Sequence, residues 1–110
     1  MCRVRHAVVL TVALAAAGFG ARAQDGDVAA GYAFAREACK ACHMVEAEES
    51  SPRRFEIGPA FRDVANTPGM TATALRVFLT SSHPKMPNLI LKPEEIADVT
   101  AYILNLRDHR

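Results

Sequence analysis

Two cysteines and a histidine lie within five consecutive residues, Cys39-Lys-Ala-Cys42-His43, and this motif constrains the chain more than any other feature. On a helix, the two cysteines would stand about 4.5 Å apart along the axis and on one face. That spacing presents two sulfur atoms to one edge of a flat ligand, with an imidazole directly after them. Covalent haem attachment, thiol–disulfide exchange and zinc binding all use closely spaced cysteines.

The order C-x-x-C-H is the attachment site of a c-type haem. Cys39 and Cys42 would bond to the two vinyl-derived carbons of the porphyrin, and His43 would offer a ring nitrogen to the iron. A thiol-redox pair usually accompanies a βαβ unit, and no segment here alternates as a strand does. Structural zinc needs four ligands, and His83 and His109 lack a matching spacing. We therefore expect one covalently bound haem c with its iron. Thiol–disulfide exchange and zinc binding are kept as alternatives.

Residues 1–23 have the order of a secretory signal peptide. Arg3 and Arg5 precede an apolar stretch from Ala7 to Phe19, and Ala21-Arg-Ala23 follows as a cleavage site. About 13 apolar residues are too few for a transmembrane helix, which needs ~20. The sequence predicts export to the periplasm, with no stable membrane insertion after cleavage, and a single mature domain over residues 24–110.

Removal of this segment changes the composition of what folds. Cleavage would remove three arginines and Cys2 but no acidic residue. The formal charge would therefore fall from +1 to −2. A near-neutral chain without a nucleic-acid-reading motif excludes a nucleic-acid-binding function. Of the 39 apolar residues in 24–110, 13 are alanine and none is tryptophan. So few large side chains make a small domain marginal alone, and we expect the haem-free chain to be largely unfolded.

Helical spacing and capping residues predict an all-α fold. A first helix is expected from residue 28 to Ala41, capped by Asp25 or Asp27. A short helical turn over 60–65 and a helix over 71–81 follow. The last helix is expected to begin at Pro93, since proline suits the first helical position. Its apolar positions recur at helical spacing: Ile96, Val99, Ile103 and Leu106.

The sixth iron ligand is expected from the proline-rich segment between the last two helices. Met86 lies there between Pro84 and Pro87, where a thioether could approach the opposite face of the haem. A thioether is neutral and soft, so it favours ferrous iron and raises the reduction potential. His83 is a rival ligand. Two other methionines suit the role less well, one because it is expected to pack and one because it adjoins the first ligand: Met70 and Met44.

Taken together, these residues resemble the small monohaem class I c-type cytochromes of the bacterial periplasm, over nearly all of 27–107. Besides the haem motif, the resemblance rests on Gly31, Gly58-Pro59, Lys85-Met86-Pro87 and the run into the last helix. It implies a cytochrome c-like fold with three to five short helices around one haem. It also implies that Gly31 packs against the last helix, where Val99 and Tyr102 occupy the matching positions.

The resemblance further implies specific roles around the haem. The carbonyl of Pro59 would accept a hydrogen bond from the ligand His43. The chain lacks the tryptophan that binds a haem propionate in some relatives, and Arg53, Arg54 or Asn88 could replace it. Six apolar side chains are expected to wall the ring: Phe34, Phe61, Leu75, Phe78, Leu89 and Ile103.

The function that the resemblance implies is electron transfer, not catalysis, with His43 and Met86 as axial ligands. Partners would be redox proteins that dock transiently, and the protein would be a monomer. Two alternatives stay open: a haem enzyme or a gas or redox sensor with an open sixth position, and a subunit of a larger oxidoreductase.

Overall fold

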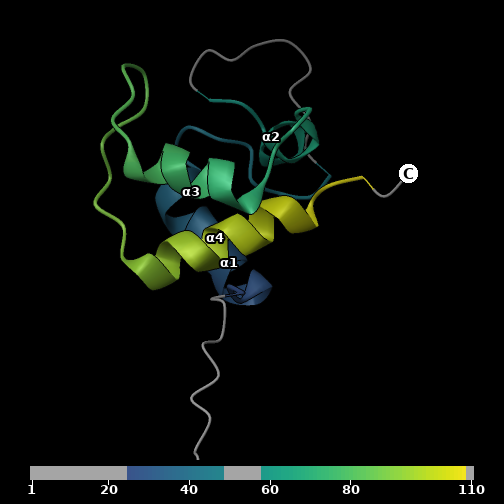
Figure 1. Ribbon diagram of the computed structural model, residues 1–110. Coiled ribbons are helices and arrows are strands. Elements are labelled where there is room, and N and C mark those ends of the chain that lie inside the picture. The colour runs from purple at the N-terminus through teal and green to yellow at the C-terminus, as the bar shows by residue number, and fades with distance from the viewer. Residues whose placement is uncertain (1–24, 49–57, 109–110) are drawn as a thin grey trace, which may run out of the picture.

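The computed structural model describes residues 25–48 and 58–108, so the predicted signal peptide and the arginines at 53 and 54 lie outside the described residues. Within the described residues the chain is helical and contains no strand, which confirms the all-α prediction. The elements are α1 (Val28–Phe34), the π-helix η1 (Ala35–Cys39), α2 (Phe61–Asn66), α3 (Ala72–Thr80) and α4 (Pro93–Asn105). Figure 1 shows α4 crossing α1 and running beside α3.

Three of the helices begin at residues that favour a helix start, and two of these, Asp27 and Pro93, were predicted. The carboxylate of Asp27 accepts a hydrogen bond from the Ala30 amide at 2.8 Å, which satisfies an N–H that has no partner within α1. The hydroxyl of Thr71 does the same for the Ala74 amide at 3.1 Å at the start of α3. Pro93 is the first residue of α4. Local chemistry therefore fixes the beginning of each of these helices.

The first helix ends differently from the prediction of a regular helix to Ala41. After Phe34 it widens into η1, where the Lys40 amide donates to the Ala35 carbonyl five residues back, at 3.0 Å. Cys39 is the last helical residue, and Cys42 lies in the turn that follows. Single π-turns of this kind occur frequently at functional sites, and this one ends at the first cysteine of the motif.

Close backbone approach joins α1 to α4. A Cβ atom on Gly31 would lie 2.0 Å from the carbonyl oxygen of Asp98 and 2.8 Å from the Cβ of Tyr102. The amide of Asp27 also donates to the Asp98 carboxylate at 2.7 Å. The predicted packing of Gly31 on the last helix is confirmed, with the backbone of Asp98 and the side chain of Tyr102 as the nearest contacts.

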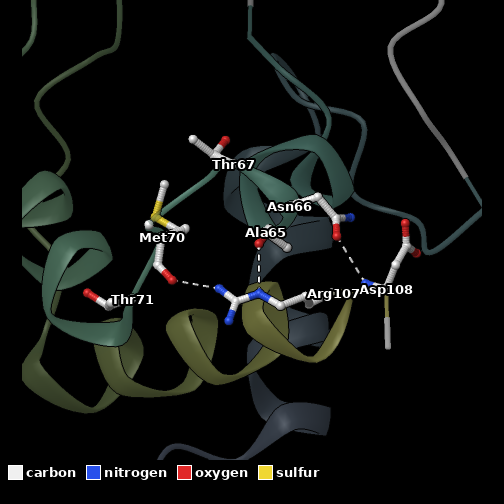
Figure 2. A pocket seen from close by; sticks show the side chains of 8 residues that line it. Ala65, Asn66, Thr67, Met70, Thr71, Arg107 and Asp108 are labelled. Atoms are coloured by element: carbon white, nitrogen blue, oxygen red, sulfur yellow. Dashed lines mark hydrogen bonds between the residues drawn. The ribbon is translucent and has the colours of Figure 1, made fainter. Parts of the chain in front are cut away.

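The end of α4 is fastened to α2 and to the turn before α3. Arg107 donates from Nε to the Ala65 carbonyl at 2.9 Å and from a terminal nitrogen to the Met70 carbonyl at 2.7 Å. The amide of Asp108 donates to the side chain of Asn66 at 3.1 Å. These residues line an open pocket of about 520 Å³, shown in Figure 2. The guanidinium thus binds one carbonyl group at the end of α2, where helical partners are missing, and one in the turn before α3.

The core is small and contains many alanines. Its largest fully buried side chains are Val45, Val99 and Thr100, and the Thr100 hydroxyl has no hydrogen-bond partner among the described residues. Larger apolar side chains that belong to the buried cluster come mainly from α2, α3 and α4: Phe61, Leu75, Tyr102 and Ile103. No helix of the described part is long and apolar enough to cross a membrane.

Candidate functional site

The three residues of the motif lie together at the end of η1. The amides of Cys42 and His43 both donate to the Cys39 carbonyl, at 3.1 and 2.9 Å, so the chain turns tightly there. Both cysteines are partly buried, and neither forms a disulfide. Burial, with a smaller contribution from Cys42, raises the pKa of the Cys39 thiol to about 11. The thiol is therefore protonated at neutral pH.

The thiol-redox alternative usually accompanies a βαβ unit, and the described residues contain no strand. The zinc alternative also lacks support. Among the described residues, no group of three or more His, Cys, Asp or Glu side chains could hold a metal ion. The motif is left with the chemistry of thioether attachment, for which two thiols within one turn are sufficient.

His43 is held by the segment that begins at Gly58. Its Nδ1 atom lies 2.7 Å from the carbonyl oxygen of Pro59. A carbonyl can only accept, so Nδ1 carries the proton and Nε2 keeps its lone pair for a metal. The hydrogen bond implied by the resemblance is thus confirmed. Partners of this kind fix the orientation of a metal-binding histidine and raise its basicity.

Two further residues contact the imidazole, and the sequence did not predict these contacts. A Cβ atom on Gly58 would lie 2.5 Å from Cε1 of His43, so only glycine lets the backbone approach the ring this closely. The ring of Phe61 lies 5.2 Å from the imidazole, tilted by 49°. Phe61 is one of the residues expected to wall the haem, and the structure shows that its ring packs beside that of His43. Its position shortly after Gly58-Pro59 was the one signal available in the sequence.

The expected sixth ligand lies in the irregular connection between α3 and α4, which Figure 1 shows as a long loop beside the helices. Met86 is half-buried there, and its role as a ligand stays a prediction. The rival His83 is engaged elsewhere. Its ring stacks on Phe78 with centroids 3.6 Å apart, and its Nε2 lies 2.6 Å from the Phe78 carbonyl oxygen. That nitrogen donates to the carbonyl and is not available to a metal in this arrangement.

The apolar residues expected to wall a haem fall into two groups. Phe61, Leu75 and Ile103 are buried in the core, and Phe34 packs against it. Phe78 and Leu89, by contrast, are 48% and 39% exposed. A haem fits this set of residues, because two thiols and a free imidazole nitrogen meet in one turn, and exposed apolar side chains are available for contact with a flat apolar group.

Charged side chains surround the outer face of the motif. The hydroxyl of Tyr32 donates to the Glu46 carboxylate at 2.6 Å. Arg36 and Lys40 lie 3.6 and 3.8 Å from the same carboxylate. The hydrogen bond to Glu46 is the main cause that raises the pKa of Tyr32 above its ordinary value of 10.0. This cluster joins α1 and η1 to the segment after His43.

Comparison with known proteins agrees with this site. The Cytochrome c family matches residues 28–107, which include the motif, the Gly58-Pro59 pair and the whole of α4. The chain belongs to the cytochrome c family. This cytochrome c is 33% identical over 102 residues to cytochrome c-552 of Bradyrhizobium diazoefficiens, and the alignment covers 93% of the chain and 96% of the relative. No solved structure matches.

Membership of the family shows the cofactor and the general function. The protein is an electron-transfer haem protein, and its cofactor is a covalently bound haem c with iron. The predicted cofactor is therefore confirmed, and its attachment through Cys39 and Cys42 with His43 as an iron ligand stays a prediction.

Proposed function

We propose that this cytochrome c is a periplasmic one-electron carrier in which His43 and Met86 are the axial ligands and Cys39 and Cys42 hold the haem. The observation that carries the proposal is the hydrogen bond from His43 Nδ1 to the Pro59 carbonyl at 2.7 Å. In the neutral imidazole it places the proton on Nδ1, leaves the lone pair of Nε2 for the iron and anchors one side of the ring.

Bound haem c supplies a centre that alternates between Fe(II) and Fe(III). Thioether bonds from Cys39 and Cys42 would keep it attached in both oxidation states. The Pro59 carbonyl makes His43 a stronger donor, and the neutral thioether of Met86 would favour the ferrous state and raise the potential. With two protein ligands, no position would stay open for dioxygen or peroxide, which distinguishes a carrier from an enzyme.

The choice of Met86 over His83 is supported by what His83 does in the fold. His83 is stacked on Phe78 and bonded to its carbonyl, so it stabilises the end of α3. Binding iron through the same nitrogen would break that hydrogen bond. Met86 lies between two prolines, each of which restricts the backbone around it. The segment therefore presents Met86 at little cost in conformational entropy.

The expected partners follow from the net charge, and the expected location follows from residues 1–23. A mature charge of −2 with only three lysines, Lys40, Lys85 and Lys92, predicts weak electrostatic attraction to an acidic partner. Docking with redox proteins would be transient and modestly dependent on salt, and the protein would act as a monomer. Cleavage after Ala23 would release it into the periplasm, and N-terminal sequencing of the exported protein should then begin at Gln24.

The ferric visible spectrum tests the ligation. The wild-type protein should show a weak sulfur-to-iron charge-transfer band, and Met86→Ala should lose it and become able to bind cyanide or carbon monoxide. Met70→Ala and His83→Ala are the matched controls and should keep the band. A high-spin wild-type spectrum that shifts on addition of carbon monoxide would contradict the proposal and favour an enzyme or a sensor.

A further inference from the structure

We propose that Phe61 is a positioning residue that sets the rotation of the His43 ring plane, and so the electronic asymmetry of the iron site. The inference rests on the proposed role of His43 as an axial ligand. It assigns to Phe61 a role beyond filling the core, exerted through the imidazole.

The hydrogen bond to Pro59 is not sufficient to fix the ring. It holds Nδ1 of His43 2.7 Å from the carbonyl oxygen. The ring turns about its Cβ–Cγ bond, and one hydrogen bond at Nδ1, the atom next to Cγ, tolerates a range of ring angles. A second contact on the ring narrows that range. The ring of Phe61, with its centroid 5.2 Å from the imidazole and tilted by 49°, supplies that contact. Tilted pairs at this separation are favourable for two aromatic rings.

Gly58 gives the imidazole of His43 the space that it occupies. Its Cα lies so close that an added Cβ would approach three atoms of the His43 ring to within 2.5–2.8 Å. Glycine thus provides the space for the imidazole, but it has no side chain that could direct the ring. The direction comes from Phe61, three residues further along the same segment.

Phe61 can position its neighbour because it is itself held at two points. Its side chain is 5% exposed, and its amide donates to the Met44 carbonyl at 2.9 Å. Its ring lies 6.5 Å from that of Tyr102, whose hydroxyl donates to the Val45 carbonyl. The two residues that follow His43 are therefore fastened to Phe61 and to α4. A change at Phe61 is transmitted directly to the ligand.

The orientation of an axial imidazole determines how unpaired spin is distributed in ferric low-spin haem, as part of the tuning that surrounding residues exert on a metal. The test is performed on the haem-loaded protein and measures the spread of the haem-methyl resonances in the paramagnetic NMR spectrum and the largest g value in EPR. Phe61→Leu should change both and should add a second low-spin component. Phe61→Tyr keeps an aromatic ring and should give a single component close to wild type.

Two further variants separate positioning from stability. Phe61→Met also lacks a ring, so it replaces Phe61→Leu if that variant does not fold, and it should give the same change. Arg107→Ala removes hydrogen bonds at the far end of α4 and should lower stability without moving either signal. The inference is overturned if Phe61→Leu and Phe61→Met match wild type, or if Arg107→Ala shifts the signals as much. If wild type lacks low-spin signals from a bound His43, the proposed ligation fails as well.

Discussion

At the scale of single residues, Gly58 shows how a missing side chain can make room for a predicted metal ligand. In Gly58→Ala, the new Cβ would lie 2.5 Å from Cε1 of His43, so the ring or the backbone must move. We expect a loss of about 1–3 kcal/mol in unfolding free energy and a changed ferric low-spin spectrum. Chemical denaturation and EPR of the haem-loaded protein measure the two effects.

Gly69→Ala is the matched control for this substitution. Gly69 has a φ of +77°, and a Cβ there would meet no atom within 4 Å. The variant should lose stability through backbone strain, because alanine rarely adopts a positive φ, yet its spectrum should equal that of wild type. A spectral change in Gly69→Ala as large as that in Gly58→Ala would refute the steric explanation.

At Thr100, by contrast, a substitution is expected to raise the unfolding free energy. Its side chain is 1% exposed, and its hydroxyl lacks a hydrogen-bond partner among the described residues. A buried polar group without a partner is costly, and valine has nearly the same shape and helix propensity. Thr100→Val should therefore raise the unfolding free energy by about 1 kcal/mol. Thr100→Ser, which keeps the hydroxyl and loses the methyl group, should lower it, and equal stability of the two variants would contradict the account.

Tyr32 carries a prediction about pH. Its hydrogen bond to Glu46 stabilises the neutral phenol and, with the carboxylate charge, raises its pKa. The folded state therefore gains stability that is fully present below the ordinary pKa of 10.0 and is lost as the pH rises through the raised value. Ultraviolet titration of the phenolate should give a midpoint above 10.0, and Glu46→Gln should lower it. Tyr32→Phe assigns the transition, since the chain has two tyrosines.

The residues of the site differ in how far the sequence could predict them. Cys39, Cys42 and His43 lie within five consecutive residues, so their spacing alone predicts the attachment site. The contact of Phe61 with His43 spans 18 positions and depends on how the segment from Gly58 folds back over the motif. Arg107 donates to the backbone carbonyl groups of Ala65 and Met70, and backbone acceptors cannot be recognised from the type of side chain. Local patterns do not encode contacts of this kind.

At the scale of elements, the contact between α1 and α4 depends on Gly31. A Cβ there would lie 2.0 Å from the Asp98 carbonyl oxygen, which belongs to the backbone of α4 and cannot move alone. Gly31→Ala should separate the two helices and lower the unfolding free energy by about 3 kcal/mol. Thermal or chemical unfolding measures the loss. Ala30→Gly, on the exposed side of α1, is the control and should cost about 1 kcal/mol through helix propensity alone.

Helix starts were predictable and the end of the first helix was not. Asp27, Thr71 and Pro93 mark helix beginnings by local hydrogen bonding or ring geometry, which act within a few residues. The segment Ala35–Cys39 has ordinary helix formers, and nothing in its composition indicates a π-turn. Such a turn depends on tertiary packing around it, and Ala35 is fully buried.

At the scale of the whole molecule, residues 25–48 and 58–108 form only a small core. The cluster of buried side chains rests on a few large residues from α2, α3 and α4, and many of its other members are alanine. Val77 and Ile90 are 59% and 98% exposed, so large apolar side chains do not all contribute to the core. A domain of this size with so few buried large side chains gains little from hydrophobic burial.

The haem is therefore expected to be part of the folding free energy and not only of the function. A variant with both Cys39→Ala and Cys42→Ala, which cannot form thioether bonds, should lack a cooperative thermal transition by circular dichroism when prepared without haem. Its helical signal should be well below that of the haem-loaded wild type. The physical reason is that a haem supplies a large apolar surface that Phe78 and Leu89, both exposed, can cover.

Two controls make this result interpretable. Wild-type protein expressed without haem attachment should behave like the double variant, which excludes an effect of the substitutions themselves. The haem-loaded protein should melt cooperatively, with the loss of the charge-transfer band and of helical signal at the same temperature. A cooperative, native-like transition in the haem-free chain would show that the small core of alanine, Val45, Val99 and Leu75 is sufficient. The haem would then be a ligand of a preformed fold, and its covalent attachment would serve retention of the cofactor alone.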